Sequence, residues 1–175
     1  MIIKTRRTLD WREPTWRVPA PAFSPLSFGR LRPDAALDDF AAALTREDVW
    51  GRFGRLVVPE RIAPMLAPAG PGFQPIGAWR GGVLAGAALL ADLGGGACEY
   101  AVVVRSDLQR RGIGLALTRR AAGRAVAAGQ GRLLAHVRAD NGRALSLLRR
   151  CGFARDGATG AEMTFVLGLE VGLHG

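Results

Sequence analysis

The chain is poor in the residues that build metal centres and disulfide frameworks. Its 175 residues include only two cysteines and two histidines. Cys98 and Cys151 show no spacing typical of metal ligands. Free cysteine is among the most buried residue types, so we expect two buried free thiols and no bound metal.

Long apolar runs are lacking as well, although 49% of the residues are hydrophobic. Arginine, aspartate or glycine interrupts each run before it reaches membrane-spanning length, and the N-terminus has no apolar segment typical of a signal peptide. These absences predict a cytoplasmic protein without a membrane partner. The length suits one domain with a proper core, and no internal repeat is visible.

Positive charge is concentrated in one half of the chain. The formal net charge is +9, and residues 101–155 hold twelve arginines against two aspartates. Such a field attracts phosphate groups, either of a nucleic acid or of a small ligand. The basic segment has no interleaved aromatic residues for base stacking and no helix-turn-helix, zinc-finger or RNP pattern. Nucleic-acid binding is therefore the less favoured alternative.

The first 25 residues differ from the remainder. They contain Trp11, Trp16 and four prolines, which disfavour a long helix, and they are too aromatic for ordinary disorder. We expect this N-terminal extension to pack on the domain or on a partner copy, as in a homodimer. Residues 26–175 then form one domain.

Within 26–175, the periodicity and turn signals predict alternating strands and helices. Thr45 and Asp48 form a capping-box pattern that starts a short helix, and residues 46–66 are a mixed segment. The expected strands are 26–31, 75–80, 83–91, 99–105, 133–138, 153–155 and 162–167, and the expected helices are 33–44, 112–128 and 141–150. This order predicts an α/β (α+β) fold with a mixed sheet and helices on both of its faces.

The most informative motif joins the strand over 99–105 to the helix that follows. It reads Gln109, Arg110, Arg111, Gly112, Ile113, Gly114 and Leu115. Glycines allow close backbone approach, and the N–H groups and dipole of a helix start attract anions. A glycine turn of this kind is also found as a plain strand-to-helix connection.

Flanking residues extend the motif. The segment over 99–108, which contains the valine-rich strand, precedes it, and Asn141-Gly142-Arg143-Ala144-Leu145-Ser146-Leu147-Leu148, ending at Gly152-Phe153, follows it. Over residues 98–153 the chain resembles the GNAT superfamily of acyl-CoA-dependent N-acyltransferases. Within it, residues 98–109 are similar to the acetyltransferase domain of bacterial Pat-type protein lysine acetyltransferases. The resemblance implies a GNAT fold, with a mostly antiparallel sheet of six to seven strands and about four helices.

The resemblance also implies acetyl-CoA as the cosubstrate. Its pantetheine arm would pair with the strand at Val102, Val103 and Val104, and its pyrophosphate would lie at residues 109–115. Asn141 would contact the cofactor as well, although its position at a helix start also suits a cap. The basic segment would favour capture of the cofactor's phosphates.

Glu99 is the candidate catalytic residue, because the Pat-type resemblance places a general base at this strand position. The structural alternative is an edge-strand carboxylate paired with an arginine. Tyr100 would point to the opposite face, into the core. His136 is a weaker candidate for a second base, since a lone strand histidine is usually a surface or satisfied group.

One departure from the superfamily concerns proton donation to the leaving thiolate. Many members have a tyrosine where this chain has Leu148, so no general acid is assigned.

The expected reaction is direct acetyl transfer to an amine acceptor, either a protein lysine or a small molecule. An acyl-CoA-sensing domain without turnover remains the alternative. Acidic residues outside the cofactor half suit a cationic amine, or equally serve as helix caps; they are Asp34, Asp38, Asp39, Glu47, Asp48 and Glu60.

Overall fold

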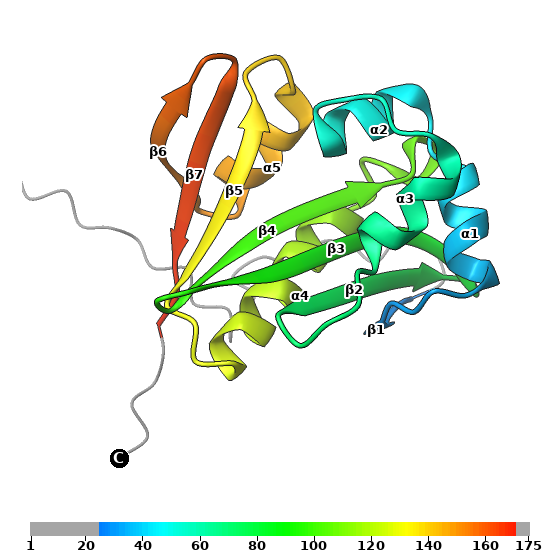
Figure 1. Cartoon of the computed structure of the whole chain (residues 1–175), viewed down its shortest axis with the longest axis horizontal. Coiled ribbons are helices and arrows are strands. Elements are labelled where there is room, and N and C mark those ends of the chain that lie inside the picture. Colours follow the sequence, from blue (N-terminus) through cyan, green and yellow to red (C-terminus); the bar gives the residue numbers. More distant parts are fainter. Residues whose placement is uncertain (1–24, 171–175) are drawn as a thin grey trace, which may run out of the picture.

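Seven strands form one sheet in the computed structural model, which describes residues 25–170 (Figure 1). The strands lie in the order β1-β2-β3-β4-β5-β7-β6, and only β4 and β5 pair in parallel. Their bounds are β1 Leu26–Arg30, β2 Phe73–Arg80, β3 Val83–Gly94, β4 Ala97–Val104, β5 Arg132–Arg138, β6 Ala154–Thr159 and β7 Glu162–Gly168. The predicted mixed, mostly antiparallel sheet is therefore confirmed.

Helices cover both faces of this sheet. They are α1 Ala35–Ala42, α2 Arg46–Phe53, α3 Pro59–Leu66, α4 Ile113–Ala127 and α5 Gly142–Arg150, with a short 3-10 turn over Ser106–Leu108. One hydrophobic core lies between the sheet and α1 to α3. The other lies on the opposite face, where α4 and α5 pack. None of the helices within residues 25–170 is long and apolar enough to cross a membrane.

The helix count differs from the prediction. Residues 46–66, expected as a mixed segment, contain two separate helices, which gives five α-helices among the described residues instead of about four. Helix α2 ends at Gly54, whose φ of 66° is left-handed, and α3 starts again with a proline at its first position. The predicted capping box of Thr45 and Asp48 is confirmed. The proposed extension over 1–25 lies, apart from residue 25, outside the described residues.

Strands β4 and β5 separate soon after they meet. Their parallel pairing is confined to Ala97–Glu99 against Arg132–Leu134, and beyond it the strands diverge (Figure 1). Strand β4 continues to pair with β3 up to Val104. The edge of β4 that faces β5 is consequently left without a strand partner over residues 100–104. This opening runs from the paired segment at Glu99 to the turn that starts α4.

Candidate functional site

The turn before α4 has the backbone geometry of an anion-binding site. Arg110 has a φ of 58° and Gly112 has a φ of 80°. Left-handed residues in such turns aim backbone N–H groups into a concavity. Within the described residues, the N–H groups of Gly112, Ile113, Gly114 and Leu115 have no hydrogen-bond acceptor. Four donors are thus available at the positive end of the helix dipole.

Gly114 also has a packing role. A Cβ at this position would lie 3.2 Å from Leu147 of α5. The glycine therefore lets α4 and α5 approach closely. Gly112 has open space around it, so its left-handed backbone is the reason for glycine there.

The side chain of Gln109 supports the turn from inside the protein. Its Nε2 donates to the Val104 carbonyl at 2.9 Å and to Oδ1 of Asp48 at 2.9 Å, and its Oε1 accepts from Arg143 at 3.1 Å. All of its polar atoms therefore have protein partners. Gln109 contributes to the turn by holding it in shape.

Asp48 is the centre of this support and is buried. Its carboxylate accepts from the Thr45 N–H, from the Ser106 N–H and hydroxyl, and from Gln109. Helix α2 is thereby tied to the connection between β4 and α4. The sequence suggested a cap for Asp48, and the structure adds contacts with residues that lie about sixty positions away.

Helix α2 also reaches the β5 side of the opening. The carbonyl of Gly51 accepts from Nδ2 of Asn141 at 3.0 Å, while Oδ1 of Asn141 caps α5. The guanidinium of Arg138 lies 5.1 Å from the centroid of the Trp50 ring. Helix α2 therefore bridges the open end of the gap between β4 and β5. The predicted capping role of Asn141 is confirmed, and its contact with a cofactor stays a prediction.

Glu99 lies on the face of β4 that carries α1 to α3. Val103, four residues further along the strand, belongs to the core under these helices, whereas Cys98 and Tyr100 belong to the opposite core. Among the described residues, Glu99 has no hydrogen bond or ion pair. Strand β4 is central in the sheet, so the edge-strand alternative is wrong in this respect.

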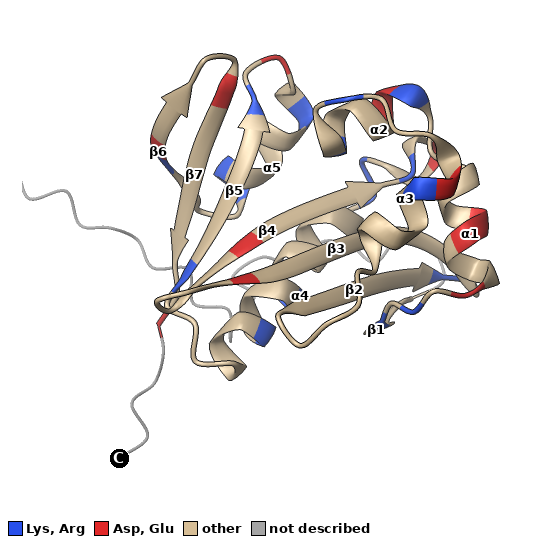
Figure 2. Cartoon of the chain, in the orientation of Figure 1, with Lys and Arg blue, Asp and Glu red and all other residues tan. Residues whose placement is uncertain are grey.

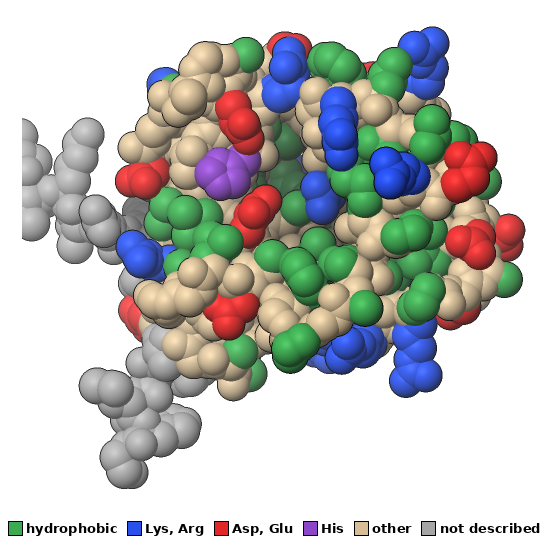
Figure 3. Space-filling view, viewed as in Figure 1, with side chains coloured by type: hydrophobic (Ala, Val, Ile, Leu, Met, Phe, Trp, Pro, Cys, Tyr) green, Lys and Arg blue, Asp and Glu red, His purple; other side chains and the backbone are tan. Residues whose placement is uncertain are grey.

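His136 shares the face of Glu99. Glu99 is in register with Leu134, and His136 follows two residues later on β5. Its Nδ1 lies 3.3 Å from the Thr164 hydroxyl and 3.9 Å from the Glu162 carboxylate. Figure 3 shows a hollow on this face, with a histidine, acidic side chains and basic side chains around it.

No phenol is available beside this opening. Tyr100, the only tyrosine of the chain, is buried, and its hydroxyl lies 2.7 Å from that of Thr118. Burial raises the pKa of Tyr100 far above its ordinary value. Leu148, which stands at the position discussed above for a tyrosine, is buried too. Burial also raises the pKa of the thiols of Cys98 and Cys151, which confirms the expectation of buried free cysteines.

Three of the six acidic residues that suggested a cationic acceptor form caps or ion pairs in the structure. Asp34 caps α1, Asp48 supports the turn, and Glu47 pairs with Arg143 at 2.9 Å. The acidic positions of α1 and α3 lie away from the gap between β4 and β5 (Figure 2). The cap interpretation thus accounts for several of these residues better than an acceptor site does.

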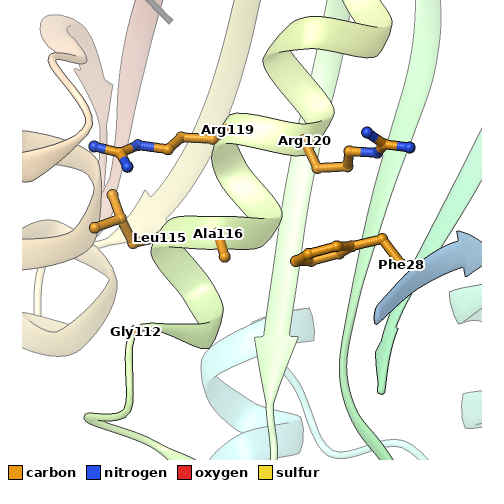
Figure 4. A pocket seen from close by; sticks show the side chains of 6 residues that line it. All are labelled: Phe28, Gly112, Leu115, Ala116, Arg119 and Arg120. Atoms are coloured by element: carbon orange, nitrogen blue, oxygen red, sulfur yellow. The ribbon is translucent and has the colours of Figure 1, made fainter. Parts of the chain in front are cut away.

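A second concave feature lies on the outer side of α4. It is lined by Phe28 of β1 and by Gly112, Leu115, Ala116, Arg119 and Arg120, and its volume is about 370 Å³. Phe28 and Arg120 lie on one side of the helix, and Leu115 and Arg119 lie on the other (Figure 4). The pocket adjoins the glycine turn and adds two arginines to its surroundings.

Arg52 was not among the residues that the sequence singled out. Asp48 and Arg52 are one helical turn apart, so they share the side of α2 that packs on β4. An arginine at helical spacing from buried residues is the sequence signal that could have pointed to it. Within residues 25–170, no group of three or more histidine, cysteine, aspartate or glutamate side chains could hold a metal ion.

A family model matches residues 36–153, which is more than half of the chain, and its description is "Acetyltransferase (GNAT) family". The chain belongs to this GNAT family. The matched region contains α2 to α5, all but the first residue of α1, the glycine turn and Glu99. No curated protein matches the chain.

Solved GNAT structures share the fold at low sequence identity. The GNAT domain of S. lividans PAT superposes with a TM-score of 0.71 and 18% identity, over 82% of this chain and 89% of that one. PaiA N-acetyltransferase from Thermoplasma acidophilum, in complex with coenzyme A, has a TM-score of 0.68 and 14% identity, covering 82% and 99%. Spermidine N-acetyltransferase from Vibrio cholerae, in complex with CoA and spermine, has a TM-score of 0.67 and 14% identity, over 82% of this chain and 95% of that one. These likenesses support the GNAT fold and leave the acceptor open.

Proposed function

We propose that this GNAT protein transfers the acetyl group of acetyl-CoA directly to a primary amine. One observation carries the proposal: an unpaired strand edge leads from the Glu99 carboxylate, which has no hydrogen bond or ion pair among the described residues, to the open N–H groups of the glycine turn. An extended thioester cofactor needs both features. Strand addition would hold its amide-bearing arm, and the helix start would hold its phosphates.

The cofactor would bind as follows. The pyrophosphate accepts hydrogen bonds from the N–H groups of 112–115, and the charges of Arg110 and Arg111 favour it. The pantetheine arm lies along Val102 and Val103, since the Val104 carbonyl already accepts from Gln109. The outer pocket of α4, with its two arginines, adjoins the glycine turn and offers a concave surface for the nucleotide part.

Glu99 would serve as the general base. A lysine-like amine of pKa near 10.4 is protonated at pH 7, and releasing its proton costs about 4.6 kcal/mol. A carboxylate at the start of the opening can accept that proton directly or through water as the nitrogen attacks the thioester carbon. The C–S bond then breaks and the coenzyme leaves as a thiolate. No side chain is assigned to protonate it, because Tyr100 and Leu148 are both buried.

The acceptor is a primary amine, of a protein lysine or of a small molecule. The motif similarity to Pat-type enzymes favours a lysine, and the structural likeness to a spermidine acetyltransferase shows that the fold accommodates a small amine in that protein. Neither similarity exceeds 25% identity.

Release of free thiol from acetyl-CoA across a panel of amines and lysine peptides tests the proposal. Amine-dependent release supports it, provided that the same fractions contain the acetylated amine. The absence of a phenol at the opening favours a second candidate, a domain that senses acyl-CoA without turnover. Stabilisation by acetyl-CoA with no thiol release from any acceptor would indicate this second function.

A further inference from the structure

Helix α2 presents a basic side chain to the region of Glu99. The helix packs on β4, on the face that carries Glu99 and Val103. Arg52 lies in its last turn, with its guanidinium carbon 4.8 Å from the centroid of the Phe53 ring. The hollow in Figure 3 lies beside α2, over the gap between β4 and β5, and contains a basic side chain.

Arg52 differs from the other arginines around the opening. Arg105 pairs with Asp107, Arg138 pairs with Asp140, and Arg143 pairs with Glu47. Arg52 has neither a hydrogen bond nor an ion pair with any residue in the described part of the chain. It is nevertheless only partly exposed.

The surroundings of Arg52 are electrostatically unusual. Burial lowers the pKa of its guanidinium, and the carboxylate of Glu99 partly offsets this lowering. Removing a charge from water without a paired counter-ion is costly. An anionic group of a ligand would relieve this cost, and guanidinium binds carboxylates through two parallel hydrogen bonds.

We infer that Arg52 binds a carboxylate of the acceptor, so that the substrate is a small amino acid whose amine faces Glu99. The inference rests on the proposed function and narrows its acceptor. A zwitterion carries an ammonium and a carboxylate within one small molecule, which complements a glutamate and an arginine on the same face of the cleft. Of the six acidic residues that suggested a cationic amine, Asp34, Asp48 and Glu47 are used in caps or ion pairs.

Matched acceptors test this assignment. Each of a set of amino acids is compared with the amine of the same side chain that lacks the carboxylate, for example phenylalanine with phenethylamine and lysine with cadaverine. Thiol release at saturating acetyl-CoA gives kcat/KM for each. In at least one pair, we expect the amino acid to exceed its amine by tenfold or more.

Variants test whether Arg52 is the residue that recognises the carboxylate of the acceptor. Arg52→Gln is expected to lower kcat/KM of the preferred amino acid, mainly through KM, so that the ratio of kcat/KM for the amino acid to that for its carboxylate-free amine falls by tenfold or more. Arg52→Lys keeps the charge and should recover part of the loss. Arg55→Gln removes an exposed charge three residues further along and serves as the matched control.

Three results would overturn the inference. The first is an equal kcat/KM for both members of every pair, or turnover only with carboxylate-free amines or lysine peptides. Either outcome would still agree with the N-acetyltransferase function. The second is a loss of acetyl-CoA affinity in Arg52→Gln, which would assign the arginine to the cofactor. The third is no turnover and no thermal stabilisation by any amino acid in the presence of CoA. Failure to bind acetyl-CoA at all would instead remove the proposed function.

Discussion

Replacement of Asp48 should both destabilise the fold and weaken the cofactor turn. Its buried carboxylate accepts four hydrogen bonds, from the N–H of Thr45, from the N–H and hydroxyl of Ser106, and from Gln109. In Asp48→Ala all four donors lose their acceptor. The helix cap provided by the Thr45 hydroxyl to the backbone N–H of residue 48 is retained.

The expected cost follows from these bonds. A hydrogen bond to a charged group contributes about 1.5–3 kcal/mol, and the capping contact contributes about 1 kcal/mol. The four bonds share one carboxylate and do not add, so we expect a loss of about 3 kcal/mol in the free energy of unfolding. For a domain of 150–250 residues this corresponds to a Tm decrease of roughly 6–12 °C.

Thermal and urea unfolding of Asp48→Ala and Asp48→Asn measure this loss. The asparagine keeps one acceptor oxygen, so its decrease should be about half as large. Glu47→Ala is the matched control, because Glu47 is adjacent, exposed and paired with exposed Arg143, an interaction of less than about 1 kcal/mol. Asp48→Ala should also weaken acetyl-CoA binding by several-fold in calorimetric titration, since Gln109 then keeps only its hydrogen bonds with Val104 and Arg143. A Tm decrease no larger than that of Glu47→Ala, with unchanged affinity, would refute this account.

Three further predictions concern the site. Gly112→Val, which forces a β-branched residue into a φ of 80°, should weaken acetyl-CoA binding more than tenfold, about 1.4 kcal/mol. An unchanged calorimetric affinity in a folded variant would contradict cofactor binding at the glycine turn. Glu99→Gln cannot accept a proton and should lower kcat by roughly 10² while affinity for acetyl-CoA stays near wild type; near-normal turnover would exclude Glu99 as the base. Replacement of Arg110 and Arg111 together by alanine should weaken CoA binding, whereas wild type should bind a random DNA duplex near 150 mM salt only with a Kd of about 10⁻⁴ to 10⁻⁶ M. Tight, sequence-dependent DNA binding would support the nucleic-acid alternative.

Local sequence signals predicted the elements of this fold well. The capping box of Thr45 and Asp48 depends on neighbouring residues. So does the turn between the expected strands 75–80 and 83–91, which Gly81 and Gly82 form with φ of 57° and 80°. The capping role of Asn141 is local in the same way. Such features need no knowledge of how the elements pack.

Contacts between distant segments could not be predicted in this way. Asp48 meets Ser106 and Gln109 only because α2 docks across β4, and nothing in a single sequence specifies that docking. The same docking packs the helix that carries Arg52 against the face of β4 that carries Glu99. The acidic composition therefore suggested a cationic acceptor. In the packed structure, the charged residue that stands out beside the gap is instead Arg52, which has no hydrogen bond or ion pair among the described residues.

The short parallel pairing of β4 and β5 divides the sheet into two hydrogen-bonded ribbons, β1 to β4 and β5 to β7, joined along three residues of each strand. At the open end, polar and aromatic contacts of α2 connect the ribbons, including those of Gly51 with Asn141 and of Trp50 with Arg138. An extended ligand in the gap would take the place of the missing strand and complete the ladder between the ribbons. Amide hydrogen exchange should then slow on both flanking strands together, so that the cofactor acts as a removable eighth strand that sets the rigidity of the sheet.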